Sequence, residues 1–491
     1  MSEHLPVLLV VVPLIAAPIS ALVGRARGSW AVAQLAALWA IVAAIGLVRR
    51  VLAEGTIHYA LGDWAAPIGI EYVVDAANAF VILIVAIIGA LSVPYMRRSI
   101  ESELSPDRVP LFYTAFLLCF AGLLGIAVTG DAFNLFVFLE ISSLSTYVLV
   151  ALGQDRRALT ASYQYLIMGS IGATFIVIGI GLMYVMTGTL NMADLAQRLP
   201  AVADTRTIPV AFTFLTVGIT LKLALFPLHL WLPNAYTYAP SAVTAFVAAT
   251  ATKVAVYMLL RFFFTVFGAT FSFETMQLDR VIIPLAVVAV LTMSLVAVFE
   301  ENAKRMLAYS SVAQVGYMIL GIGLASVLGV TAGLLHIFNH ALMKGALFMA
   351  LGCVAYRVGS VRIARMTGLG RTMPWTMAAF VAAGLSLIGV PLTVGFISKW
   401  YLVQAALEQG LWILAVVVLG GSLLAVIYVW RVVEVAYFRP AEAGTTVREA
   451  PLALLVPTWA LVLANFYFGI DASLTTGVAG RAAETLLGVG P

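Results

Sequence analysis

Apolar stretches of about 20 residues recur along the whole chain and are separated by short polar segments. At a helical rise of about 1.5 Å per residue, each stretch can cross a hydrocarbon core about 30 Å thick. No segment between them is long enough to form a soluble domain. The pattern predicts an all-α polytopic membrane protein with about 14 transmembrane helices, at residues 5–23, 30–48, 74–96, 109–129, 132–152, 161–187, 208–230, 240–264, 281–300, 306–327, 330–356, 374–407, 411–437 and 451–471.

The seventh predicted span, residues 208–230, contains a proline that should interrupt its helix. Pro227 has no backbone N–H to donate to the carbonyl of Leu223, and its ring clashes with that turn. We expect the helix to end or unwind just after Lys222, so that freed carbonyl groups lie beside a charged side chain.

The twelfth predicted span, residues 374–407, is too long for one straight crossing. Helix-breaking residues lie in its middle, shortly before Lys399. The span is therefore predicted to form two half-helices, with a break that involves Gly389, Pro391 and Gly395.

The two interrupted spans are five positions apart in the order of spans, so they cross the membrane in opposite directions. Paired interruptions in oppositely oriented halves are typical of inverted-repeat transporters, which place their ion site near the midplane. We therefore expect two inverted five-helix repeats. The predicted division is residues 1–108 for three N-terminal helices, 109–264 for the first repeat, 281–437 for the second, and 451–491 for the last helix and the C-terminal tail.

Composition and charge support a membrane location. The chain is 63% hydrophobic and only 10% charged, against roughly 25% charged residues in soluble domains. When the loops alternate between the two sides, 16 of the 27 Lys and Arg residues fall on one side and 7 on the other. The richer side is expected to be cytoplasmic, which predicts a plasma (inner) membrane protein with both termini extracytoplasmic. Cys119 and Cys353 lie singly in apolar spans, so no disulfide, metal site or redox cofactor is predicted.

The lysines have an unusual distribution. Only Lys304 is predicted to lie in a loop, whereas the other four lie inside spans. A charge at mid-membrane costs about 2.5 to 3.5 kcal/mol even on a lenient scale. One such lysine often has a structural role, but four favour a shared function. The four intramembrane lysines are Lys222, Lys253, Lys344 and Lys399.

Glu140 is the one acidic residue well inside a predicted span. A buried carboxylate needs a cation nearby, and Lys222 is the natural candidate. Pairing favours the charged forms of both groups, while burial favours their neutral forms. A lysine in such a balance can take up and release a proton.

Histidines extend this set of ionisable groups. His336, His340 and Lys344 have spacings of i, i+4 and i+8, so they lie on one helical face within about 80°. Because histidine titrates near pH 6.5, the stripe can relay protons; each histidine alone is equally compatible with a hydrogen bond to a neighbouring helix. The histidine pair has no carboxylate or thiolate nearby in sequence, so it does not indicate a metal site. His229 is expected at the mouth of a proton path.

Polar residues also surround Lys253 in the sequence and are expected to hold water beside it; they are Thr250, Thr252 and Tyr257.

Five stretches show a resemblance to a known family. They are "NLFVFLE", "KLALFPLHLWLPNAYTYAPSAVTAF", "KRMLAYSSVAQVGYM", "HIFNHALMKGALFM" and "GVPLTVGFISKW". In order and spacing the chain resembles the antiporter-like subunits shared by Mrp-type cation/proton antiporters and respiratory complex I. Within this family it is most similar to the D-type Mrp subunits. Lysine rather than histidine at position 253, and a chain that ends soon after the last span, disfavour the larger subunit type with a long lateral helix or an appended domain.

The resemblance implies specific roles for the ionisable residues. Glu140 and Lys222 would form the paired switch of the first half-channel, Lys253 the linking lysine, and Lys399 the outlet of the second half-channel. His336, His340 and Lys344 would lie on the span that connects the two half-channels.

The expected function is proton translocation along buried Glu, Lys and His residues, within a multisubunit Na⁺/H⁺ antiporter. The expected partners are other membrane subunits, the lipid bilayer, H⁺ and Na⁺, with no cofactor in this chain and no nucleic acid. The main alternative is a proton-pumping subunit of complex I or of a membrane-bound hydrogenase, which would be part of an enzyme only through its partners. A role in inorganic-carbon uptake and a structural scaffold with an inert charge network are further alternatives.

Overall fold

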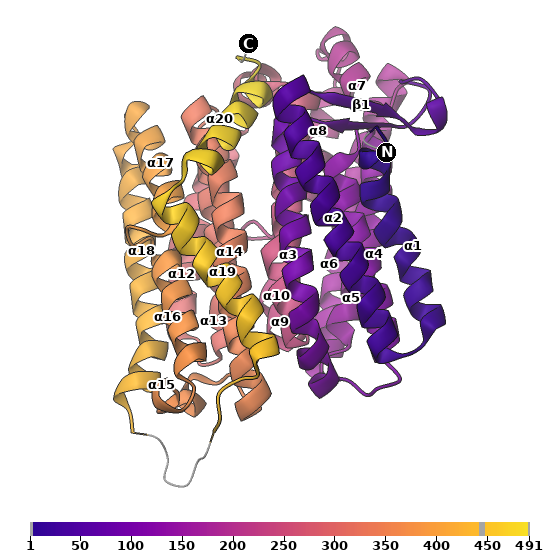
Figure 1. Ribbon diagram of the computed structural model, residues 1–491. Coiled ribbons are helices and arrows are strands. Elements are labelled where there is room, and N and C mark those ends of the chain that lie inside the picture. The colour runs from indigo at the N-terminus through magenta and orange to yellow at the C-terminus, as the bar shows by residue number, and fades with distance from the viewer. Residues whose placement is uncertain (1–2, 441–446, 490–491) are drawn as a thin grey trace.

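The computed structural model describes residues 3–440 and 447–489, which form a bundle of long helices with a common axis (Figure 1). In these residues, 12 helical segments are long and apolar enough to cross a membrane. They are α1 (Leu5–Val23), α2 (Ala26–Glu54), α3 (Ala76–Glu103), α4 (Val109–Val128), α5 (Ala132–Ala151), α6 (Arg157–Thr187), α10 with η3 (Ser241–Val266), α11 with η5 and α12 (Asp279–Phe299), α13 (Ala303–Gly323), α14 (Val327–Val358), α18 with η7 (Trp412–Phe438) and α19 (Leu452–Ile470).

Two further predicted spans are interrupted helices, which confirms the predicted breaks and accounts for the count of fourteen. In the first, α8 (Thr207–Lys222) ends at the lysine, and α9 (Trp231–Tyr238) begins after a connection that contains Pro227. The indole of Trp231 donates a hydrogen bond of 3.1 Å to the carbonyl of Leu221, which the interrupted helix leaves without its usual partner. The first break is thus stabilised by a side chain of its own second half.

In the second interrupted span, α16 (Pro374–Ile388) ends at Gly389, whose φ of 94° suits glycine, and α17 begins at Val394 and ends at Glu408. Pro391 lies in the connection. Gly395 was predicted to be part of the break but lies in the first turn of α17. A Cβ atom there would be 1.8 Å from the carbonyl oxygen of Ser386. Gly395 is therefore needed for the close packing of the two half-helices.

Several short elements were not predicted, because they lie in the polar segments between spans or after the last one. The antiparallel hairpin β1–β2 pairs Ile57 with Val74 and Ala60 with Glu71. The short elements are β1 (Ile57–Ala60), η1 (Leu61–Asp63), β2 (Glu71–Val74), α7 (Met192–Arg198), η2 (Leu199–Val202), η4 (Thr270–Thr275), η6 (Ile363–Met366), α15 (Leu369–Thr372) and α20 (Ser473–Leu487).

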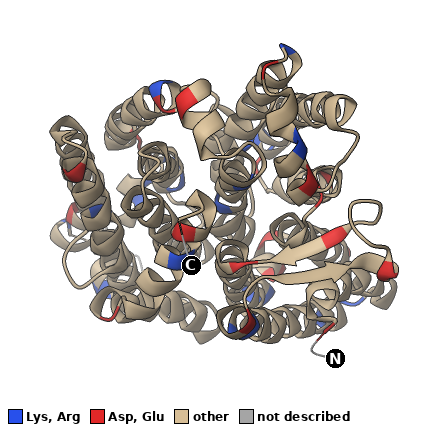
Figure 2. Cartoon of the chain, turned by 90° about the horizontal axis from the view of Figure 1, so that it is seen from above, with Lys and Arg blue, Asp and Glu red and all other residues tan. Residues whose placement is uncertain are grey.

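The bundle has two distinct ends. The hairpin, α7, α20 and both chain ends lie at one end, which we call the hairpin end (Figure 1). The opposite end, which we call the far end, holds the end of α3, the start of α10 and α15. Seen along the bundle axis, charged residues lie on interior helices as well as on the periphery (Figure 2).

The interior of the bundle is built from α10, α13 and α14. Nearly all residues in the most apolar parts of these three helices are buried, whereas α1, α2, α6 and α18 have large exposed faces. Helix α14 packs against α10, α13, α16, α17 and α19. It therefore joins the second interrupted helix to α10, the helix that follows the first interrupted helix in the chain.

Candidate functional site

Lys222 lies at the last residue of α8, where the first interrupted helix ends. Its Nζ atom donates a hydrogen bond of 2.9 Å to Ser143 Oγ and lies 3.6 Å from Glu140 Oε1. The lysine side chain is only 5% exposed, while that of Glu140 is 28% exposed. The expected pair is thus brought together, with the lysine inside the protein and the carboxylate at the lateral face of α5.

The surroundings of Lys222 can stabilise its charge in two independent ways. The C-terminal end of a helix carries partial negative charge, which favours a cation by about 0.3 to 1 kcal/mol. The distance to Glu140 is that of an ion pair but is too long for a good hydrogen bond. Because Ser143 is the hydrogen-bond acceptor, Lys222 can lose its electrostatic contact with Glu140 and keep a hydrogen bond.

A small cavity lies between Lys222 and α10. Its volume is about 30 Å³, and its lining includes Lys222, Ser143 and Thr146 on one side and Ala251 and Val254 of α10 on the other. A water molecule needs about 10 to 15 Å³ of such space. The cavity can therefore hold water between Lys222 and the turn of α10 that carries Lys253.

Lys253 is fully buried in α10. Its ammonium group donates to the carbonyl of Ala248 and, at 3.2 Å, to Thr252 Oγ1. The other two predicted neighbours form different contacts. Thr250 donates to the carbonyl of Phe246 in its own helix, and the Tyr257 hydroxyl accepts from Arg261. Only Thr252 of these three has a hydrogen bond to Lys253.

The three predicted groups of α14 all face inward, and each is buried. His336 contacts Ser398 Oγ at 2.8 Å through Nδ1 and Gln314 Oε1 at 2.9 Å through Nε2. The His340 ring lies 6.1 Å from the His336 ring, and among the described residues neither of its nitrogens has a hydrogen-bond partner.

Lys344 contacts α13 rather than another charged group. It donates 2.9 Å hydrogen bonds to the carbonyl of Leu307 and to Ser310 Oγ. Its charge is within electrostatic range of Lys253 and His340. Two buried lysines from different halves of the chain therefore act electrostatically on His340, which has no hydrogen bond among the described residues.

Lys399 on α17 reaches back to the end of α16, across the second break. It donates to the carbonyls of Leu387 and Ile388 at 3.0 and 2.9 Å and to Ser422 Oγ at 2.9 Å. Its Nζ atom also lies 5.0 Å from the centre of the Tyr317 ring. The preceding residue, Ser398, is the hydrogen-bond partner of His336. The helix turn that carries Lys399 therefore contacts α14 directly.

His229 lies in the connection between α8 and α9 and is buried. Its ring stacks on Phe226 with a centroid distance of 5.4 Å. Its Nδ1 atom has no hydrogen-bond partner in the part of the chain that the structure describes. It contacts the backbone of Pro227 at the first break, and among the described residues no hydrogen bond or ion pair joins it to Glu140 or Lys222.

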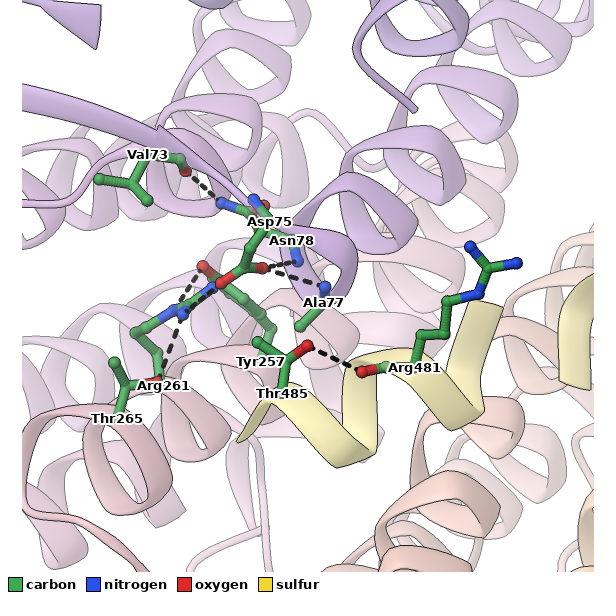
Figure 3. Close-up of polar contacts among 9 residues, drawn as sticks. All are labelled: Val73, Asp75, Ala77, Asn78, Tyr257, Arg261, Thr265, Arg481 and Thr485. Carbon is green, nitrogen blue, oxygen red and sulfur yellow. Dashed lines mark hydrogen bonds and ion pairs between the residues drawn. The ribbon is translucent and has the colours of Figure 1, made fainter. Parts of the chain in front are cut away.

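Sequence reasoning missed an ion pair at the hairpin end of α10 (Figure 3). Arg261 Nη1 lies 2.7 Å from Asp75 Oδ2, and each side chain is 8% exposed. Asp75 also caps α3 by accepting from the N–H groups of Ala77 and Asn78. The available signal was an aspartate directly before an apolar run, which is a typical N-cap position. Arg261, the cation that pairs with Asp75, lies 186 residues away in the sequence.

Lys304 is not in a loop as predicted, but lies in the first turn of α13, where it is buried. It donates to the carbonyl of Ala239 at 3.3 Å and to Ser241 Oγ at 3.0 Å. The helix starts here because the Asn302 side chain accepts from the N–H of Arg305. The asparagine just before an apolar run was the signal that could have placed Lys304 in a helix.

Comparison with known proteins gives consistent matches over most of the chain. Residues 129–425 match a family described as NADH:quinone oxidoreductase/Mrp antiporter, TM. A relative in Desulforudis audaxviator, named as the N subunit of NADH-quinone oxidoreductase, is 41% identical over 489 residues, which cover 96% of each chain. A relative in Alkalihalophilus pseudofirmus, named as the D-type subunit of a Na(+)/H(+) antiporter, is 31% identical over 450 residues, which cover 91% of this chain and 90% of the relative.

The fold also matches a solved assembly. A chain in the structure of the Mrp complex from Dietzia sp. DQ12-45-1b superposes with a TM-score of 0.89 and 26% sequence identity. The match covers 99% of this chain and 97% of that chain. The similarity therefore includes all the elements that carry the predicted site residues.

Proposed function

The chain belongs to the NADH:quinone oxidoreductase/Mrp antiporter transmembrane family, and on that premise we propose that it is the proton-translocating subunit of a multisubunit Na⁺/H⁺ antiporter. One observation carries this proposal: the Glu140–Lys222 pair lies at the end of an interrupted helix and next to a buried series of ionisable groups. That series ends at Lys399, at the second interrupted helix. Ionisable groups inside a membrane are costly, and they typically mark ion and proton pathways.

The first step of the proposed mechanism is electrostatic. At about 4 Å and an effective dielectric constant of about 20, Glu140 stabilises the charge of Lys222 by about 4 kcal/mol. Protonation or displacement of Glu140 would remove that stabilisation and change the proton affinity of Lys222 roughly a thousandfold. The lysine would then release its proton while Ser143 keeps the side chain in place.

The released proton would pass through the small cavity toward Lys253 and then along α14. Lys253 and Lys344 both act electrostatically on His340, and His336 connects through Ser398 to the Lys399 turn. Imidazole nitrogens and hydroxyl groups can each accept one proton and donate another. We assign residues 109–264 and 281–437 to the two half-channels, each built as one of two inverted five-helix repeats.

The proposed orientation follows from the distribution of basic residues. The far end carries most of the loop Lys and Arg residues and would face the cytoplasm of a plasma membrane. The hairpin end, with both chain ends, would face outward. The antiporter would assemble from this chain and other membrane subunits, with Na⁺ as the exchanged cation.

A second candidate is a proton pump that is driven by electron transfer in partner subunits. The relative that is 41% identical is named as a subunit of NADH-quinone oxidoreductase, and this name favours the second candidate. Purification of the native complex separates the two. Copurifying iron–sulfur and quinone-reactive subunits would support the electron-driven pump, whereas small membrane subunits alone would support the antiporter.

The direct test of proton translocation uses Glu140→Gln in the assembled complex, reconstituted in vesicles with a pH-sensitive dye. We expect proton transport to fall at least tenfold, because glutamine cannot hold the Lys222 charge. Glu408→Gln is the matched control, because Glu408 is an exposed carboxylate at the end of α17. Wild-type transport by a fully assembled Glu140→Gln complex would overturn the proposal.

A further inference from the structure

The ammonium group of Lys222 lies among oxygen atoms of α5. Its Nζ atom donates to Ser143 Oγ at 2.9 Å and is 3.6 Å from Glu140 Oε1. A serine oxygen that accepts a hydrogen bond turns a lone pair toward the cation, and the carboxylate brings one negative charge. Hard metal cations also prefer oxygen ligands of these kinds. The surroundings of the ammonium group therefore resemble those of a bound metal cation.

Two oxygen atoms at this place are buried and, among the described residues, have no hydrogen bond of good geometry. One is Glu140 Oε1, whose contact with Lys222 is an ion pair, and the other is the hydroxyl oxygen of Tyr147. Tyr147 is 5% exposed, and its hydroxyl lies beside Ser143 and against Gly169 of α6. An unpaired buried oxygen is costly, so its presence indicates a further role, such as binding an ion.

The three oxygen-bearing side chains share one face of α5. Glu140, Ser143 and Tyr147 have spacings of i, i+3 and i+7, which places them within about 60° of one another. The C-terminal end of α8 meets this face at Lys222. In transporters with interrupted helices, such half-helix ends help to coordinate Na⁺. The adjoining cavity of about 30 Å³ has space for water as a further ligand.

This place can hold only one cation at a time. A second positive charge about 4 Å from the ammonium group would be repelled by about 4 kcal/mol at an effective dielectric constant of about 20. The single carboxylate of Glu140 balances one charge. Lys222 has a flexible four-carbon stem, so its ammonium group can leave the oxygen atoms while α8 stays in place. A metal cation and the ammonium group would therefore exclude each other.

We propose that Na⁺ binds between Glu140, Ser143 and Tyr147 in place of the Lys222 ammonium group, so that this chain itself holds the exchanged cation. The proposal rests on the proposed antiport and names the site at which the exchanged cation competes with the charge of the lysine. The second break offers no equivalent site. Within the described residues, Lys399 has two carbonyls and one serine hydroxyl as partners and no carboxylate within ion-pair distance.

Binding of radiolabelled Na⁺ to the purified, assembled complex tests the site without transport. Lys222→Met removes the competing charge and keeps an apolar stem. We expect Lys222→Met to bind Na⁺ at least tenfold more tightly than the wild type at one site per complex. The double variant with Glu140→Gln should lose this gain. Lys399→Met is the matched control and should gain no Na⁺ binding, because it removes a lysine that has no carboxylate nearby.

The hydroxyl ligand is tested with Tyr147→Phe, which removes one oxygen atom and no charge. We expect the Na⁺ concentration for half-maximal proton transport in vesicles to rise about fivefold. Tyr113→Phe should leave this concentration unchanged, because it alters a buried tyrosine of α4. Since Tyr147→Phe keeps every charge, it decides the proposal even if Lys222→Met does not assemble.

Three results would each overturn the Na⁺ site. They are no gain of Na⁺ binding in Lys222→Met, an equal gain in Lys399→Met, and an unchanged Na⁺ dependence in Tyr147→Phe. If Glu140→Gln still lost proton transport in the same vesicles, the Na⁺ site alone would fail. Wild-type transport by Glu140→Gln would instead overturn the proposed function.

Discussion

Lys222 and Lys399 occupy similar places in the two interrupted helices, but their electrostatic surroundings differ. Both lie next to the C-terminal end of a half-helix, where freed carbonyl groups favour a cation. Lys222 lies 3.6 Å from a carboxylate that is itself partly exposed. In the described part of the chain, Lys399 has no carboxylate within ion-pair distance and is held by two carbonyls and a serine hydroxyl.

On the proposed mechanism, this difference makes Lys222 a switchable site and Lys399 a fixed one. The contact between Lys222 and Glu140 is made by two side chains, so movement of either one can break it. The dipoles around Lys399 belong to the backbone and to one side chain, so their strength changes only if the half-helices move. We therefore expect control of transport at the first break and passive proton release at the second.

The backbone supports the comparison of the two breaks. Each connection contains one non-glycine residue with a left-handed backbone, Ala224 with a φ of 59° and Leu392 with a φ of 71°. Such residues cost about 1 to 3 kcal/mol each and occur mainly where surrounding structure enforces them. The same unfavourable conformation at both breaks favours the proposed repeat relation between them.

The largest expected effect comes from Lys222→Arg, which keeps the positive charge but prevents its release, because arginine does not deprotonate in proteins. We expect transport to fall roughly a hundredfold, equivalent to about 2.7 kcal/mol of barrier, while the complex still assembles. Proton flux in vesicles and complex recovery on size-exclusion chromatography are the measurements. If the lysine served only as a structural cation, Lys222→Arg would transport normally.

The second prediction concerns the geometry of the Lys399 site. Gly395→Ala places a methyl group against the Ser386 carbonyl, so α16 and α17 must separate and lengthen the lysine's hydrogen bonds. We expect transport to fall about tenfold and thermal stability to drop by several degrees, because overpacking typically costs about 1 to 3 kcal/mol. Gly181→Ala in α6 is the control, because a methyl group there has no neighbouring atom within 4 Å. Unchanged transport in Gly395→Ala would contradict a site that depends on fixed carbonyls.

The sequence alone predicted the parts of this comparison that depend on local pattern. Span positions follow from the length of apolar runs, and the first break follows from the chemistry of Pro227. The placement of Lys222 and Lys399 beside the breaks followed from the helix-breaking residues near them in the sequence. The spacing of His336, His340 and Lys344 placed all three on one helical face, and the structure shows that this face is buried.

The parts that sequence could not predict depend on contacts between distant segments. Lys304 is buried because its partners are Ala239 and Ser241, more than 60 residues earlier in the chain. Asp75 meets Arg261 only after α3 packs against α10. Closeness in the sequence also did not predict where a side chain points. Tyr257 was expected beside Lys253, but its hydroxyl accepts a hydrogen bond from Arg261. Local pattern thus located the charged residues, and packing determined their partners.

The smallest expected effects come from the two serines, and they test the switch against the fixed site most directly. Ser143→Ala leaves Lys222 with Glu140 alone, whereas Ser422→Ala leaves Lys399 with two backbone carbonyls. A typical hydrogen bond contributes about 0.5 to 1.5 kcal/mol, and Lys222 keeps its ion pair with Glu140 when the Ser143 hydroxyl is removed. We therefore expect about a fivefold fall in transport for Ser143→Ala and less than a twofold fall for Ser422→Ala.

The Ser143→Ala defect should also depend on Glu140. In the double variant with Glu140→Gln, the two losses should not multiply, because both substitutions act on the ammonium group of Lys222. Multiplicative losses, or a larger effect at Ser422, would show that Lys222 and Lys399 do not differ in the way their surroundings indicate.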